Sequence, residues 1–107
     1  MKIVYTNTAR RDLREIYEHI AYTLLAPNTA KALSEKLMQE IRLLKSLPER
    51  NPLYRDEPWH SQGVRFLRVK NYLVFYTVNL DTDTISVARI MYGGRDISRQ
   101  LEETSEW

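Results

Sequence analysis

The chain has 107 residues, with 16 Lys and Arg against 14 Asp and Glu, and its composition is 43% hydrophobic and 28% charged. These values predict one folded domain, residues 1–107, and exclude wholesale disorder. The absence of cysteine excludes a disulfide framework and a cysteine nucleophile, and two histidines are too few for a histidine-based metal site unless several carboxylates join them. No apolar run approaches the ~20 residues of a membrane span, and the start lacks a signal-peptide pattern. We therefore expect a cytoplasmic protein with no metal, cofactor, membrane association or small-molecule substrate.

The chain begins with a predicted strand and helix. Residues 2–5 are β-prone, and Asn7 or Thr8 can cap a helix because a short side-chain oxygen accepts from the free N–H groups of its first turn. The apolar residues of this helix form one stripe: Leu13, Ile16, Tyr17, Ile20 and Leu24. We expect Pro27 to end the helix.

A second helix is predicted to start at Asn28 or Thr29. Its apolar residues again form a single stripe: Ala30, Leu33, Leu37, Ile41 and Leu44. Because the break between the two helices is short, they should pack as an antiparallel hairpin.

The second half of the chain predicts strands. A proline-rich loop over residues 46–63 precedes strand patterns at 64–69, 72–78 and 84–92, with turns at 70–71 and 80–83. The middle strand is almost entirely apolar or aromatic, as expected for a strand buried on both faces. Residues 96–101 can form one helical turn, and the acidic tail 102–107 is expected to fray.

The order β-α-α-β-β-β predicts an α+β domain. Its N-terminal strand should join an edge of a small, mostly antiparallel sheet, and the helical hairpin should cover one face of that sheet.

Few residues suggest catalysis. His60 follows Trp59 in the proline-rich loop, where it is either a general base or an ordinary loop residue without a partner spaced to orient it. His19 lies off the apolar stripe and is interpreted as a solvated helix residue. Asp81 and Asp83 are expected to cap backbone groups of a turn rather than act as paired carboxylates.

Basic and aromatic residues concentrate in the strand region. The basic residues are Arg65, Arg68, Lys70, Arg89, Arg95 and Arg99, and they surround Tyr72, Tyr76 and Tyr92. Such a set suits a phosphate backbone or an acidic protein, but the tyrosines can equally be core residues with the arginines as a solvated rim. Strand alternation places Arg65 and Arg68 on opposite faces, so the two cannot line one flat patch unless a bulge intervenes.

Several short motifs also follow one another along the chain. They are residues 8–20 (with Arg10, Arg11, Asp12 and Leu13), Pro27 with Ala30, Leu47 with Pro48, and residues 69–76 and 90–96. In order and spacing they resemble the RelE/ParE toxins of bacterial type II toxin–antitoxin modules over nearly the whole chain. The resemblance implies a helical hairpin on a small antiparallel sheet, a growth-inhibiting activity and a cognate antitoxin that neutralises it.

The family has two mechanisms, and the resemblance favours one of them. RelE-like toxins cut mRNA on the ribosome, whereas ParE-like toxins poison DNA gyrase and are not nucleases. RelE-like sequences usually carry Arg directly after the Tyr that opens the penultimate strand, but Leu73 follows Tyr72 here. The late catalytic Tyr or His is also missing, and residues 91–101 are closer to the ParE-like pattern. We therefore expect gyrase poisoning without catalysis; the alternative is a ribosome-dependent mRNA endoribonuclease with a diverged site.

Candidate residues can be named for the target, for a nuclease site and for the antitoxin. The proposed target-binding residues are Arg89, Arg95 and Arg99, near the C-terminus. The diverged nuclease would use Arg65, Lys70, Arg95 and His60. Tyr22 and Met38, which flank the helix stripes, are candidate contacts for the antitoxin.

Overall fold

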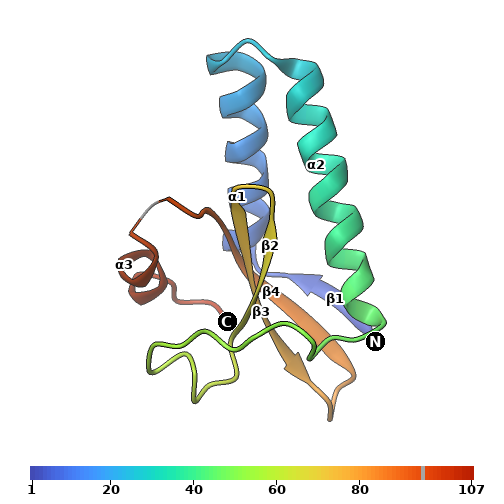
Figure 1. The fold of residues 1–107 in the computed structure, drawn as a ribbon, viewed down its shortest axis with the longest axis vertical. Coiled ribbons are helices and arrows are strands. Elements are labelled where there is room, and N and C mark those ends of the chain that lie inside the picture. The colour runs from blue at the N-terminus through green and yellow to red at the C-terminus, as the bar shows by residue number, and fades with distance from the viewer. Residues whose placement is uncertain (95) are drawn as a thin grey trace.

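The computed structural model describes residues 1–94 and 96–107 of the chain. Its elements are β1 (Lys2–Tyr5), α1 (Asn7–Glu18), α2 (Pro27–Arg42), β2 (Arg65–Val69), β3 (Tyr72–Asn79), β4 (Thr84–Tyr92) and α3 (Ile97–Glu102). The sheet has the order β1-β4-β3-β2, in which β1 runs parallel to β4 and the other pairs are antiparallel (Figure 1). The α+β class, the helical hairpin and the edge position of the first strand are thus confirmed.

The first helix is capped one residue earlier than expected. Neither Asn7 nor Thr8 is the cap; instead the Thr6 side chain accepts a hydrogen bond from the Ala9 N–H at 3.1 Å. Thr6 directly follows β1 and has extended backbone angles, which is the conformation an N-cap requires. Strand and helix therefore adjoin without a loop.

The end of the hairpin also differs from the expectation. Helix α1 continues as a π-helical turn, His19–Thr23, and the chain then reverses at Leu25, whose φ is 54°. The expectation that Pro27 ends the first helix is wrong, because the helical run already ends at Thr23. Pro27 instead begins α2, one residue before the predicted start at Asn28 or Thr29, at a position where its missing N–H costs no hydrogen bond. The π-helical turn and this reversal leave Leu24 59% exposed instead of in the core.

Two apolar cores lie on opposite faces of the sheet. The hairpin covers one face, where the whole predicted stripe of the second helix is buried with Val74 and Tyr76 of β3. Ala30, Leu33, Leu37 and Ile41 of this stripe lie on α2, and Leu44 lies in the 3₁₀ turn Leu43–Lys45 that follows it. Loop residues and α3 cover the other face, where Leu73 and Phe75 of the same strand pack with Trp59, Val64, Met91 and Leu101. Strand β3 is therefore buried on both faces, as its composition predicts.

The hairpin extends beyond the sheet, and α3 lies to one side of it (Figure 1). None of the helices in the described part of the chain combines the length and apolar composition that a membrane span needs. In the tail, Glu106 Oε1 accepts hydrogen bonds from the N–H and hydroxyl of Thr8 at 3.1 and 3.0 Å.

Candidate functional site beside strand β4

Strand β4 is longer than the strand that borders it. Strand β1 pairs only with residues 84–87 of β4. Beyond this point the Thr6 hydroxyl donates to the Ala88 carbonyl at 2.9 Å, and an Asp12 carboxylate oxygen accepts from the Ile90 N–H, also at 2.9 Å. Side chains from α1 and its cap thus replace a neighbouring strand along residues 88–92, here called the edge segment.

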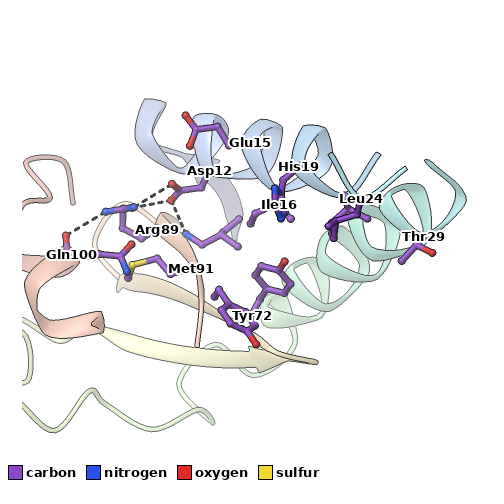
Figure 2. Close-up of a pocket in the computed structure, with 13 residues that line it drawn as sticks. Asp12, Glu15, Ile16, His19, Leu24, Thr29, Tyr72, Arg89, Met91 and Gln100 are labelled. Atoms are coloured by element: carbon purple, nitrogen blue, oxygen red, sulfur yellow. Dashed lines mark hydrogen bonds and ion pairs between the residues drawn. The ribbon is translucent and has the colours of Figure 1, made fainter. Parts of the chain in front are cut away.

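Asp12 is also paired with Arg89, and Figure 2 shows both side chains between α1 and β4. Arg89 Nε lies 2.8 Å from one carboxylate oxygen and Nη2 lies 3.2 Å from the other, so the contact is bidentate. The two side chains are only 14% and 9% exposed, for Arg89 and Asp12 respectively. Asp12 is the one charged residue buried among those that the structure describes.

A cleft of about 590 Å³ opens between α1 and the edge segment (Figure 2). Its apolar lining includes Ile16, Ile20, Leu24, Ile90 and Met91, and its polar lining includes Asp12, Glu15, His19, Thr29, Arg89 and Gln100. Tyr72 and Tyr92 also line it, with ring centroids 5.7 Å apart in an edge-to-face arrangement. Burial raises the pKa of the Tyr72 hydroxyl above its ordinary value of 10.0.

The C-terminal segment, residues 97–106, is bound to three parts of the fold. Arg89 Nη1 donates to the Gln100 carbonyl at 3.3 Å and to the Thr104 hydroxyl at 3.0 Å. The Ser98 hydroxyl contacts Asp56 at 3.1 Å in the proline-rich loop. Together with the Thr8–Glu106 contact, these bonds attach the segment to β4, the loop and the start of α1.

The three predicted target-binding arginines differ in position. Arg89 is internal and engaged with Asp12 and the C-terminal segment. Arg99, on α3, is 70% exposed and lies 3.9 Å from Glu103, one helical turn further on. Arg95 lies outside the described residues. Their role in target binding stays a prediction. Arg89 is buried in contacts within the protein, whereas Arg99 is exposed to solvent.

The residues of the alternative nuclease site are not brought together where the structure describes them. The Arg65 side chain is 19% exposed, and its guanidinium donates hydrogen bonds to the carbonyls of Glu49 and Asn51, with the Glu49 carboxylate 3.5 Å away. Lys70 follows the far end of β2, roughly 16 Å away along the strand. His60 is exposed in the loop, with its Nδ1 3.1 Å from the Tyr54 carbonyl. As predicted, Arg65 and Arg68 lie on opposite faces of the sheet. Arg65 pairs with Tyr76, which belongs to the core under the hairpin, and Arg68 pairs with Leu73, which belongs to the core on the other face.

The sequence-family model for the ParE toxin of the type II toxin–antitoxin system, parDE, matches residues 3–97 of the chain. The chain belongs to this family. The resemblance to RelE/ParE toxins, and to the ParE branch in particular, is thereby confirmed, and the protein is a ParE/RelE-family toxin of a type II toxin–antitoxin system.

Solved structures support the fold of this ParE-family toxin. It is similar to a chain in the structure of the chromosomal ParDE system from P. aeruginosa, with a TM-score of 0.70 and 23% identity. The match covers 86% of this chain and 95% of the P. aeruginosa chain. The toxin is also similar to the RelBE2 toxin–antitoxin complex from Mycobacterium tuberculosis, with a TM-score of 0.57 and 21% identity over 85% and 95% of the two chains. No curated protein sequence gave a significant match.

The two candidate antitoxin contacts lie in different parts of the ParE-family hairpin. Tyr22 is 68% exposed in the π-helical turn. Met38 lies about 16 Å along α2 from its first residue. It is half-buried, and the Tyr5 hydroxyl donates to its sulfur at 3.5 Å, so it is less exposed than its expected role requires.

Sequence reasoning missed Asp12 as part of the site. Asp12 appeared only as one letter of a family motif, and its position in a helix between Arg11 and Leu13 indicates a solvated carboxylate. Its partner lies 77 positions further along the chain. The one local signal is an acidic residue directly before the apolar stripe of α1.

Proposed function

We propose that this ParE-family toxin arrests growth by binding and poisoning DNA gyrase, without catalysing a reaction itself. The observation that carries the proposal is the dispersal of the candidate nuclease residues. RNA cleavage by a 2′-hydroxyl needs a cation at the phosphate and a proton acceptor close to the same bond. Here Arg65 is held by loop carbonyls, and Lys70 lies at the other end of the strand.

A second observation concerns the position where RelE-like sequences carry arginine. Leu73 occupies it here and is buried in the core on the loop-covered face, packed with Phe75 and Met91. A leucine offers no hydrogen bond to phosphate, and its side chain contributes to stability instead. The alternative, a ribosome-dependent endoribonuclease, would therefore need a different set of phosphate ligands.

We propose that the C-terminal segment contacts the target. Arg99 supports this because it is exposed on a helix fixed to the body of the protein. Arg95 is included from its place in the sequence, directly after Gly93 and Gly94. Both arginines suit an acidic surface on the gyrase or its DNA.

We further propose a cognate antitoxin that covers the cleft and the exposed end of the hairpin. The cleft is lined by apolar side chains, and Tyr22, Leu24 and Leu25 next to it are exposed. Apolar side chains grouped in this way are typical of surfaces that a partner buries. Both similar structures come from toxin–antitoxin systems, and one of them is a toxin–antitoxin complex.

Gyrase supercoiling with purified toxin, with and without ATP, tests the proposed target. We expect dose-dependent inhibition and accumulation of linearised DNA, both relieved by the antitoxin. Arg95→Ala and Arg99→Ala should weaken inhibition while the protein stays folded. Arg14→Ala is the matched control, because Arg14 is also an exposed helix arginine with a glutamate four residues later.

Two results would contradict the proposal. Normal supercoiling at saturating toxin would reject that gyrase as the target. Cleavage of translated mRNA in a purified ribosome assay, lost in Arg65→Ala or Lys70→Ala, would establish the nuclease alternative.

A further inference from the structure

We infer that Arg89 is a positioning residue, which holds the C-terminal segment in place so that Arg99 is presented to the target. It is not itself a contact for the target. The inference rests on the proposed function for the identity of the target, but the contacts that hold the segment are independent of it.

The guanidinium of Arg89 connects three elements at once. Its Nε and Nη2 hold the Asp12 carboxylate on α1, at 2.8 and 3.2 Å. Its Nη1 donates to the Gln100 carbonyl at 3.3 Å and to the Thr104 hydroxyl at 3.0 Å, which belong to α3 and the residues just after it. The edge of the guanidinium that faces α3 is therefore occupied, and little of the side chain reaches solvent.

The direction of Arg89 is set by the edge segment. Asp12 accepts from both Arg89 and the backbone N–H of Ile90, the next residue on β4. The carboxylate is thus fixed between helix and strand, and its bidentate contact orients the plane of the guanidinium. The remaining donors of that rigid plane then point toward the C-terminal segment.

Helix α3 needs such support, because a helix of six residues is not stable in isolation. Apart from Arg89, it is held by buried Leu101 and by the contacts of Ser98 with Tyr54 and Asp56. Arg99 directly precedes Gln100, whose carbonyl accepts from Arg89. The position of the exposed arginine is therefore determined, one residue away, by the buried one.

Lysine cannot replace this arrangement. The ammonium of an Arg89→Lys variant retains a charge for Asp12, but it lacks the planar fork that reaches the carboxylate and the Gln100 carbonyl together. Thr104→Val is milder, since it removes the hydroxyl that accepts from Nη1 and donates to the Gln100 carbonyl at 2.9 Å but leaves the contact of Arg89 with Asp12. Thr104→Ser restores that hydroxyl.

The test combines hydrogen exchange, measured by mass spectrometry on the full-length toxin, with two activity readouts. We expect Arg89→Lys to speed amide exchange of residues 97–104 by about tenfold, with α2 peptides unchanged. Growth arrest on expression and gyrase inhibition should weaken by a similar factor. Thr104→Val should shift each readout in the same direction by a smaller factor, and Thr104→Ser should restore them. Ile41→Val, in the core between α2 and the sheet, controls for a general loss of stability.

Each outcome decides the inference. If Arg89→Lys loses activity while exchange of 97–104 is unchanged, Arg89 is a target contact and the inference is wrong. If exchange rises without any loss of growth arrest, positioning of the segment is not needed and the inference is also wrong. If wild-type toxin arrests growth but leaves gyrase intact, the proposed target fails, and the exchange and growth-arrest data still judge the role of Arg89.

Discussion

The outer edge of β4 is covered in two different ways along the two halves of the strand. Residues 84–87 have an outer edge paired with β1 by backbone hydrogen bonds. The edge segment, residues 88–92, is paired with β3 on its inner side but has no strand on its outer edge among the described residues. Thr6 and Asp12 contact that outer edge, and the cleft lies beside it. The register shift between Phe75 and Tyr76 on the neighbouring β3 coincides with the change from one half to the other.

The difference shows how a short strand creates a site. Backbone pairing satisfies an edge with groups that every residue except proline carries, so it is tolerant of sequence. Side-chain coverage depends on a few residues and leaves space between helix and sheet, which here becomes the cleft. The edge segment should therefore be more sensitive to single substitutions than the half of β4 that is paired with β1.

The largest expected effect is that of Asp12→Ala. It leaves both the Arg89 guanidinium and the Ile90 N–H without their carboxylate, which should lower the free energy of unfolding by about 3–5 kcal/mol. Urea denaturation followed by circular dichroism measures this change. Glu15→Ala, one turn along the same helix, should change it by less than ~0.5 kcal/mol. Equal losses in the two variants would contradict the importance of the edge segment.

Tyr76→Phe tests the point where the two halves meet. The Tyr76 hydroxyl donates to the Pro48 carbonyl at 2.7 Å and accepts from Asn51 at 3.1 Å. Losing it should destabilise the fold by about 1–2 kcal/mol, because the partly buried Pro48 carbonyl loses its donor and the Asn51 amide loses its acceptor. Denaturation near neutral pH measures the loss, and an unchanged midpoint would contradict it.

Tyr76 also predicts a pH dependence. Burial raises the pKa of its hydroxyl above 10.0, so the folded state retains a proton that the unfolded state releases. The corresponding stability is fully present below pH 10 and is lost as the pH rises further. The stability of Tyr76→Phe should therefore fall less steeply than that of wild type between about pH 9 and 11. Tyr5 and Tyr72, whose pKa values are also raised by burial, account for a remaining slope.

Thr6→Ala should cost about 1 kcal/mol of unfolding free energy, the usual value for an N-cap. The loss includes the bond to the Ala88 carbonyl, at the start of the edge segment. Thr6→Ser keeps the hydroxyl and should recover most of the stability in thermal denaturation. A serine variant as unstable as the alanine variant would indicate that the methyl group, not the cap, matters.

The smallest effect is expected in the half of β4 that is paired with β1. Asp83 precedes this half, is 75% exposed and lies 3.3 Å from the N-terminal ammonium. Asp83→Asn removes the charge but keeps a side chain that tolerates its φ of 53°, so stability should fall by less than ~0.5 kcal/mol. A loss comparable to that of Asp12→Ala would show that both halves depend on charge.

Much of the fold is predictable because it follows from local periodicity. The stripe of α2 and the strand at 84–92 are as expected, and the continuous apolar run of β3 correctly indicates burial on both faces. The exact cap at Thr6 and the start of α2 at Pro27 are less predictable, because several neighbouring residues are suitable for either role. Leu24 has the right spacing for the core, yet the π-helical turn and the chain reversal leave it exposed.

The sequence by itself determined the element order, the opposite faces of Arg65 and Arg68, and the resemblance to a toxin family, since these depend on spacing within short stretches. Only the tertiary structure decided which charged residues are exposed and which are buried in a contact. Arg89 and Arg99 look alike in the sequence, but one faces Asp12 across 77 positions and the other faces solvent. The physical reason is that an ion pair forms where folding brings two groups together out of water, and no local pattern records that distance.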